Sequence, residues 1–195
     1  MVGETQNRLG KFPNLTVELR IAETLGYAEN QFDAVLCCMS LHVFADWQRP
    51  MLAMHRVLRE GGWLAASVNT TSQNSLTGSL RTLIGKHYPP SAEIAALHEH
   101  QFRLGDANRI RVPFEMAGFR EIETAIETQL FSYPSFEAYF EPMTTSNSPW
   151  GAEYAELPPE VKQVVRQDLR QELKRGNPGG PVEIAVTIQF AAGRK

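Results

Sequence analysis

One run of the chain restricts its fold more than any other segment: Phe32 to Met39 is almost continuous apolar sequence. Strands with one face in water alternate apolar and polar residues, whereas a nearly uninterrupted apolar run is typical of a parallel strand covered on both faces. The fully apolar part, Ala34 to Met39, is far shorter than a membrane span. The run therefore predicts a buried strand in an α/β sheet.

The residues after this run complete a βαβ unit. Asp46 is placed to cap a helix that we expect to reach about Arg59, and Gly61-Gly62 supplies a left-handed stop after it. Trp63 to Val68 is the next expected strand. A strand, a helix and a second strand within so short a span predict a right-handed crossover between parallel strands.

Strand-like and helix-like segments alternate along the rest of the chain, which indicates an α/β fold. Further strands are expected at 15–21, 119–131 and 182–191, and a charged tail from Gly193 onward is expected to leave the sheet. Helices are expected at 2–12, 76–84, 91–98, 106–117, 135–139 and 159–175, with a loop at 147–151.

Composition narrows the class of protein. The chain has 195 residues, which suits one domain, and 19 basic against 22 acidic residues give a formal net charge of −3. This balance offers no electrostatic case for nucleic acid or an anionic membrane. The two cysteines, Cys37 and Cys38, are adjacent in the apolar run, so we expect both to pack there and the protein to be cytoplasmic, with reduced thiols.

Three motifs resemble one enzyme family. They are Phe32-Asp33-Ala34-Val35, Ser40-Leu41-His42-Val43-Phe44, and Arg56-Val57-Leu58-Arg59-Glu60-Gly61-Gly62-Trp63-Leu64. In this order they resemble the class I S-adenosylmethionine-dependent methyltransferases. More narrowly, they are similar to the small-molecule branch of ubiquinone-biosynthesis-like enzymes. Ala117-Gly118-Phe119 and residues 182–195 are similar to later pieces of the family.

The resemblance implies a Rossmann-like sheet with strand order 3-2-1-4-5-7-6, strand 7 antiparallel, and the cofactor across the carboxyl ends of the strands. Residues 15–21, 32–39, 63–68, 119–131 and 182–191 would be strands 3, 4, 5, 6 and 7. Strands 1 and 2 have no counterpart, and no Gly-x-Gly-x-Gly turn occurs in the 195 residues. The expectation is one incomplete, N-terminally truncated domain over 1–195, with variable roof segments at about 70–104 and 133–157.

The resemblance also implies a set of residues for the cofactor, S-adenosylmethionine. Ile21 stands where the family often has a carboxylate for the adenine amino group, and the backbone of Ala22 or the side chain of Glu23 could substitute. Ser40 and His42 follow strand 4, beside the methionine portion and the methyl group. The whole expected set is Ile21, Ala22, Glu23, Met39, Ser40 and His42.

His42 is the candidate catalytic residue, although a packing role in its loop remains open. A sulfonium methyl is already activated, so transfer rests mainly on holding the reactants in line. A general base is needed only for a poorly acidic acceptor.

An acceptor pocket is expected in the roof, lined by Tyr88, His98, His100 and Phe102. No metal is expected, because His98 and His100 point to different faces of a helix and no thiolate accompanies them. Aromatic residues of a second cluster suit either a pocket or a satellite core: Phe131, Tyr133, Phe136, Tyr139 and Phe140. A basic stripe with interleaved acids predicts a solvated helix face: Lys162, Arg166, Arg170 and Lys174.

Two functional hypotheses follow. The first is S-adenosylmethionine-dependent methyl transfer to a small-molecule acceptor by in-line displacement, with part of the cofactor site missing from this chain. Carbon, oxygen, nitrogen and arsenic acceptors all stay open. The second is a non-catalytic methyltransferase-like module that dimerises or binds a partner through the open edge of residues 32–39.

Overall fold

The computed structural model describes residues 2–9, 12–145, 149–175 and 180–195. Its sheet has four strands in the order β1-β2-β4-β3, namely β1 (Phe32–Cys38), β2 (Leu58–Asn69), β4 (Val182–Arg194) and β3 (Arg120–Tyr133). β1 and β2 are parallel, whereas β4 is antiparallel to both β2 and β3. The α/β class and the antiparallel last strand are therefore confirmed.

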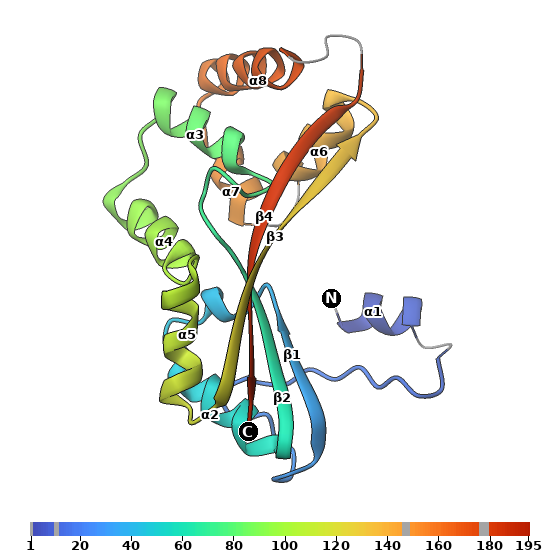
Figure 1. The fold of residues 1–195 in the computed structure, drawn as a ribbon. Helices are drawn as coiled ribbons and strands as arrows, with labels where there is room; N and C mark the ends of the chain where they lie inside the picture. Colours follow the sequence, from blue (N-terminus) through green and yellow to red (C-terminus); the bar gives the residue numbers. More distant parts are fainter. Residues whose placement is uncertain (1, 10–11, 146–148, 176–179) are drawn as a thin grey trace.

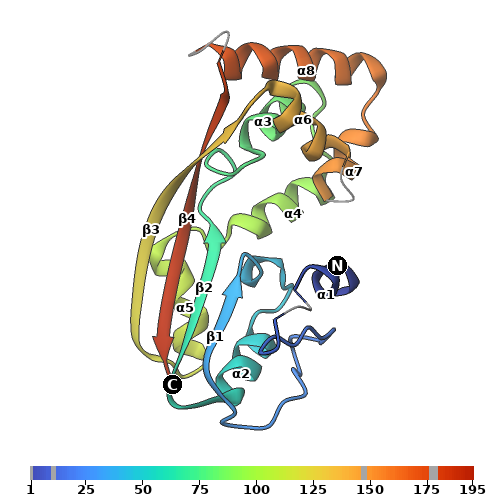
Figure 2. The same ribbon diagram turned by 90° about the vertical axis from the view of Figure 1, so that its right-hand side faces the viewer.

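The helices gather at two ends of the long β3–β4 pair (Figure 1). One end is the one where the C-terminus lies in space, and it carries α2 (Gln48–Val57), α5 (Ala107–Met116) and the short helix η1 (Leu41–Val43). The other end carries α3 (Gly78–His87), α6 (Phe136–Thr145), α7 (Pro149–Ala155) and α8 (Pro159–Lys174), and α4 (Ala92–Phe102) runs between (Figure 2). α1 (Val2–Leu9) stands apart.

The predicted βαβ unit is present, with Val35 opposite Leu64 and Cys37 opposite Ala66. The expected helix stop at Gly61-Gly62 is wrong, because the chain is already extended at Leu58 and both glycines lie inside β2. Gly61 has φ +77° at the point where the register between β1 and β2 shifts. A left-handed glycine accommodates such a bulge without steric cost.

The strand expected at 15–21 is also wrong. Every residue from Phe12 to Gln31 is described, and this segment forms turns and irregular chain rather than a strand. The side chains of Leu19 and Ile21 are 85% and 69% exposed. Alternating sequence becomes a strand only where a neighbouring strand pairs its backbone, and the described sheet ends at β1. Strands 3, 2 and 1 of the expected order thus have no counterpart among the described residues.

The burial of β1 differs from its prediction. Cys37 is 7% exposed, but Leu36, one position away, is 72% exposed, and Cys38 is exposed as well. Successive side chains of a strand point to opposite faces. One face of β1 therefore packs on the core and the other is open, so the packing role predicted for both cysteines holds only for Cys37.

β4 changes its buried face halfway along its length. Val182, Ile184 and Val186 are buried in its first half, and Gln189 and Ala191 in its second half. The alternation shifts phase between residues 186 and 189, so the two halves of β4 bury opposite faces. The tail expected to leave the sheet at Gly193 instead continues β4 to Arg194.

Each half belongs to a different hydrophobic core. The proximal core lies where β1, β2, α2 and α5 meet, and includes Leu41, Met51, Leu58, Leu64, Phe114 and Ala191. The distal core lies among α3, α6, α8 and the first half of β4, and includes Leu80, Phe136, Tyr139, Leu169 and Val182. The chain thus builds two cores on opposite faces of one long strand pair.

Candidate functional site

The carboxyl end of β1 is the first part of the site. The backbone N–H of Met39 donates to the carbonyl oxygen of Ser67 at 3.0 Å and lies 3.1 Å from its Oγ, which ties the end of β1 to β2. Met39 has φ +49°, so the chain turns sharply out of the sheet there. The Oγ of Ser40 donates to the carbonyl of Cys38 at 2.8 Å. This edge of a parallel pair is where open α/β sheets place ligands.

His42 is buried directly beyond this turn, with 3% of its surface exposed, beside Leu41 at 0%. Among the described residues its Nδ1 has no hydrogen-bond partner. Burial, and then the nearby His100, lower the pKa of His42, so its imidazole is neutral at physiological pH. A buried polar atom without a partner is uncommon in a folded protein, and a catalytic role is one of its recognised explanations.

Helix α4 holds the loop after η1. The carbonyl of Phe44 lies 3.0 Å from Nε2 of His100 and accepts from Nη2 of Arg103, also at 3.0 Å. Because a carbonyl can only accept, Nε2 of His100 carries a proton and donates it to this bond. α4 thus brings His100 close to His42 from a distant part of the sequence.

The other expected cofactor residues lie in a turn rather than at this edge. The carbonyl of Ile21 accepts from the N–H of Leu25 at 2.8 Å, and the side chain of Glu23 is exposed. Within the described chain no hydrogen bond joins Ile21, Ala22 or Glu23 to Met39, Ser40 or His42. Their part in cofactor binding stays a prediction.

Two of the four expected acceptor residues share a cavity of about 250 Å³. Its lining residues are Ser72, Arg81, Thr82, His98, Glu99 and Phe102. The guanidinium carbon of Arg81 lies 5.3 Å from the ring centroid of Phe102, and burial lowers the pKa of Arg81 to about 10. Nε2 of His98 pairs with Glu153 of α7 at 3.3 Å. Sequence reasoning missed Arg81, although a lone cation in the apolar stretch Leu80–Ile84 was an available signal.

The other two residues lie elsewhere. Tyr88 lines a separate cavity of about 370 Å³ with Ile84, Ile94 and Leu157. His100 faces the loop after η1, as described above. α4 therefore connects the two places, because it carries His98 and Phe102 toward the cavity and His100 toward η1.

The aromatic cluster is mainly a core. Phe136, Tyr139 and Phe140 are 1%, 0% and 2% exposed, and the Phe136 and Phe140 rings stack with centroids 5.1 Å apart. The hydroxyl of Tyr139 donates to the carbonyl of Leu76 at 2.8 Å. Phe131, at 40% exposed, lies outside this core. Of the two interpretations left open, the satellite core is right for the three buried rings.

Two further findings concern the described ranges only. The described residues hold no group of three or more His, Cys, Asp or Glu side chains placed to bind a metal ion. None of their helices combines the length and apolar character needed to cross a membrane.

Residues 1–66 match a family model described as a methyltransferase domain. This segment contains β1, η1, α2 and the first part of β2, so it includes the carboxyl edge where His42 is buried. A search of curated proteins found no match.

Solved structures share the fold. A putative methyltransferase from Bacillus halodurans is 16% identical, with all of this chain and 78% of that chain covered and a TM-score of 0.54. The YcgJ protein from Bacillus subtilis is 14% identical, with 100% and 78% covered and a TM-score of 0.52. Phosphoethanolamine N-methyltransferase 2 from Haemonchus contortus, solved with S-adenosyl-L-methionine, is 16% identical, with 100% and 41% covered and a TM-score of 0.52.

At these identities the structural likeness concerns the fold, and the family match concerns the first third of the chain. The two agree with each other and with the motifs at residues 32–64. Together they support an enzyme of the methyltransferase class. Residues 1–66 thus carry a methyltransferase domain match, and the described chain has the Rossmann-like α/β fold of methyltransferases.

Proposed function

We propose that the protein transfers a methyl group from S-adenosylmethionine to a small-molecule acceptor at the carboxyl end of β1. The observation that carries this proposal is His42, which is buried beside the ends of two parallel strands with Nδ1 unpartnered among the described residues. It lies inside the segment that matches the methyltransferase domain. A buried neutral imidazole there suits contact with a cofactor or an acceptor.

The residues at this edge fit one part of the cofactor. Met39 turns the chain away from the sheet, and Ser40 and His42 follow within reach of the same strand end. Bound S-adenosylmethionine supplies a methyl group that its sulfonium has already activated. The work left to this chain is to hold the acceptor in line and, where the acceptor is a hydroxyl or an amine, to take its proton on the imidazole of His42.

We assign the acceptor to the cavity lined by Arg81, His98 and Phe102. Its support is α4, which joins the cavity wall to η1 through the bonds of His100 and Arg103 to Phe44. The narrower branch, similar to ubiquinone-biosynthesis enzymes, rests on the motifs at 40–44 and 56–64. We place the protein in the cytoplasm, since Cys37 and Cys38 are free and burial raises the pKa of the Cys37 thiol to about 11.

The rest of the cofactor site needs a glycine-rich turn that the 195 residues do not contain. We infer that a further strand beside β1 supplies it, so that this chain is one part of the complete catalytic unit. The support is the outer edge of β1, which pairs with no strand of the described sheet. A strand added there would continue the parallel sheet and bring its turn to the edge where His42 lies.

Calorimetry with S-adenosylmethionine tests the function directly. We expect micromolar binding once a glycine-rich segment from the adjoining reading frame is joined to the chain, and much weaker binding by the 195 residues alone. His42→Gln should then lower kcat at least tenfold. His87→Gln is the control. His87 lies away from this edge, where its Nε2 pairs with Oδ2 of Asp168 at 2.8 Å. No heat from the extended protein, or equal activity of both variants, would contradict the proposal.

A second candidate function is a module that acts by dimerisation or partner binding. Leu36 and Phe190 are 72% and 38% exposed, and the strand registers place them on the same face of the sheet. An open apolar face next to an open strand edge favours association. Sedimentation of a monodisperse monomer across micromolar concentrations would remove this candidate.

A further inference from the structure

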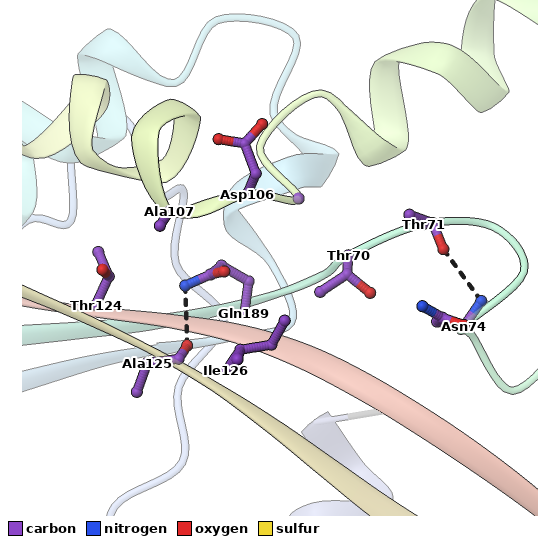
Figure 3. A pocket seen from close by; sticks show the side chains of 10 residues that line it. Thr70, Thr71, Asn74, Asp106, Ala107, Thr124, Ala125, Ile126 and Gln189 are labelled. Carbon is purple, nitrogen blue, oxygen red and sulfur yellow. Dashed lines mark hydrogen bonds between the residues drawn. The ribbon is translucent and has the colours of Figure 1, made fainter.

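A third cavity, of about 490 Å³, opens where β4 changes its buried face (Figure 3). Its lining comes from the segment after β2, the start of α5, and the middle of β3 and β4, and consists of Thr70, Thr71, Asn74, Gly105, Asp106, Ala107, Thr124, Ala125, Ile126 and Gln189. β1 and η1 contribute none of these residues, and Thr70 and Thr71 directly follow the carboxyl end of β2. Its volume is in the range of small-molecule sites.

Gln189 is a buried polar residue in its wall. The side chain is 3% exposed, and Nε2 donates to the carbonyl oxygens of Ala125 at 2.9 Å and Phe190 at 3.0 Å. Both of these partners can only accept, so the orientation of the amide is fixed and both of its N–H groups are used. Its Oε1 has no partner among the described residues and is not sealed in the protein, which leaves it as an acceptor facing the cavity.

The charge of the lining indicates the class of ligand. Asp106 is its one ionisable residue. Its Oδ1 caps α5 by accepting from the N–H groups of Asn108 and Arg109, and its Oδ2 lies 3.0 Å from Nε of Arg109. The carboxylate is therefore already paired with a cation, and the same bonds occupy the start of the helix. We therefore expect neither an anion nor a cation to bind more tightly here than a neutral molecule.

The wall is formed before any ligand enters. A Cβ at Gly105 would lie 1.8 Å from the carbonyl oxygen of Thr70, so only glycine permits this approach. The Oγ1 of Thr70 donates to the carbonyl of Thr187 at 3.0 Å, and the N–H of Thr187 donates to the carbonyl of Asn74 at 2.9 Å. A preformed wall reduces the entropy lost on binding.

The mouth of the cavity is apolar. Ile126 lines it at 61% exposure, and Leu130, which points to the same face of β3, is 53% exposed. Ala107 and Ala125 add small apolar surfaces. We propose that this cavity binds an uncharged small molecule with an apolar body and an N–H or O–H group that donates to Oε1 of Gln189. Its lining shares no residue with the proposed methyl-transfer edge, and the proposal does not depend on that edge.

The test is an NMR titration of the full chain with benzamide and phenol as neutral probes, and with benzoate and benzylamine as charged counterparts. We expect the neutral probes to bind with Kd below about 10 mM and to shift the amides of Thr124, Ala125 and Gln189. Benzoate and benzylamine should bind at least tenfold more weakly.

Two variants locate the binding. Ala107→Leu fills the cavity from an exposed position at the start of α5, and Gln189→Met removes the hydrogen-bond acceptor Oε1. Each variant should weaken the binding of benzamide at least tenfold. Ala96→Leu makes the same change on the exposed face of α4 and should have no effect. Gln189→Met also loses two hydrogen bonds to backbone carbonyls. If that variant does not fold, Ala107→Leu alone decides the test. Absent shifts, equal binding of charged probes, or undiminished binding by Ala107→Leu would overturn the proposal.

Discussion

The proximal and distal cores use the same two strands in different ways. The proximal core packs Leu41, Met51 and Leu64 around Phe114 of α5, and its polar neighbour His42 is buried without a partner for Nδ1 among the described residues. The distal core stacks the rings of α6 under cations of α8, with Arg170 4.7 Å from the Phe136 ring centroid. The proximal half therefore buries a polar atom without a partner in the described chain, whereas the distal half covers its aromatic rings with cations.

This comparison corrects the interpretation of α8. Its basic stripe was expected to be a solvated face, yet Arg166 lies 5.1 Å from the centroid of Phe140, and Arg170 pairs with Glu137. These cations cover the aromatic core while staying partly in water. Their spacing along the helix indicates which residues share a face but not what the face touches.

The largest effect is expected in the proximal core. Phe114 is 0% exposed and its ring centroid lies 5.4 Å from that of Phe119. Phe114→Ala should lower the free energy of unfolding by about 3–5 kcal/mol, since it removes a buried ring and leaves a cavity. Urea unfolding measures the loss. Val112→Ala on the same helix, 42% exposed, is the control, and similar losses for both would contradict the assigned core.

A comparable change tests whether the distal core is a separate unit. Leu169 of α8 is 0% exposed, and Leu169→Ala should cost about 2–5 kcal/mol. Hydrogen exchange should accelerate in α3, α6 and α8 while β1 and β2 keep their protection, because the two cores share only the β3–β4 pair. Val164→Ala, 41% exposed, is the matched control. Uniform acceleration over the whole chain would show one cooperative core instead of two.

A smaller effect is expected from overpacking. A Cβ at Gly193 would lie 2.8 Å from Cδ1 of Phe114 and 3.0 Å from Cβ of Phe119, so Gly193→Ala should destabilise the protein by about 1–3 kcal/mol. Gly85→Ala in α3 makes the same change with no atom within 4 Å, and should stabilise its helix by about 0.5–1 kcal/mol. Thermal unfolding of the two variants should therefore shift in opposite directions. A shift of the same sign would refute the packing argument.

The smallest effect concerns pH. Burial, followed by the influence of His100, lowers the pKa of His42 in the folded state, so the unfolded chain binds a proton more readily than the folded one. The contribution of His42 to stability is then fully present above its unfolded-state pKa of about 6.5. It is lost as the pH falls toward its lower folded-state pKa. Burial lowers the pKa of His55 and His98 too, which adds to the same slope. His42→Gln should reduce the loss of stability between about pH 7 and pH 5; an unchanged slope would count against a buried neutral His42.

Local features of the fold were predictable from the sequence. Asp106 accepts from the N–H groups of Asn108 and Arg109 as a helix cap, and α8 begins at Pro159 as its prolines indicate. β1 and β2 form the parallel pair that the apolar run and the following helix predict. Each of these depends on residues close together in the chain, so neighbouring sequence is enough to specify it.

Features that depend on distant neighbours were not predictable. Residues 15–21 alternate as a strand should, but no strand of the described residues pairs with them. Leu36 lies in an apolar run yet is 72% exposed, because nothing described covers that face. The loop expected at 147–151 falls partly outside the described residues, and Pro149 to Gly151 already belong to α7. In the candidate site, the sequence indicated His42 but not the approach of His100 to it, nor the burial of Arg81.

By itself, then, the sequence determined the α/β class, the βαβ unit and the motif that carries His42 to the end of β1, because these follow from short-range pattern. Only the tertiary structure decided which face of each strand is covered. The phase shift in β4, the two cores on either side of it and the cavity beside Gln189 arise where helices distant in sequence pack on the same strands. Alternation along a strand defines two faces, and the elements that pack against the strand determine which of them is buried.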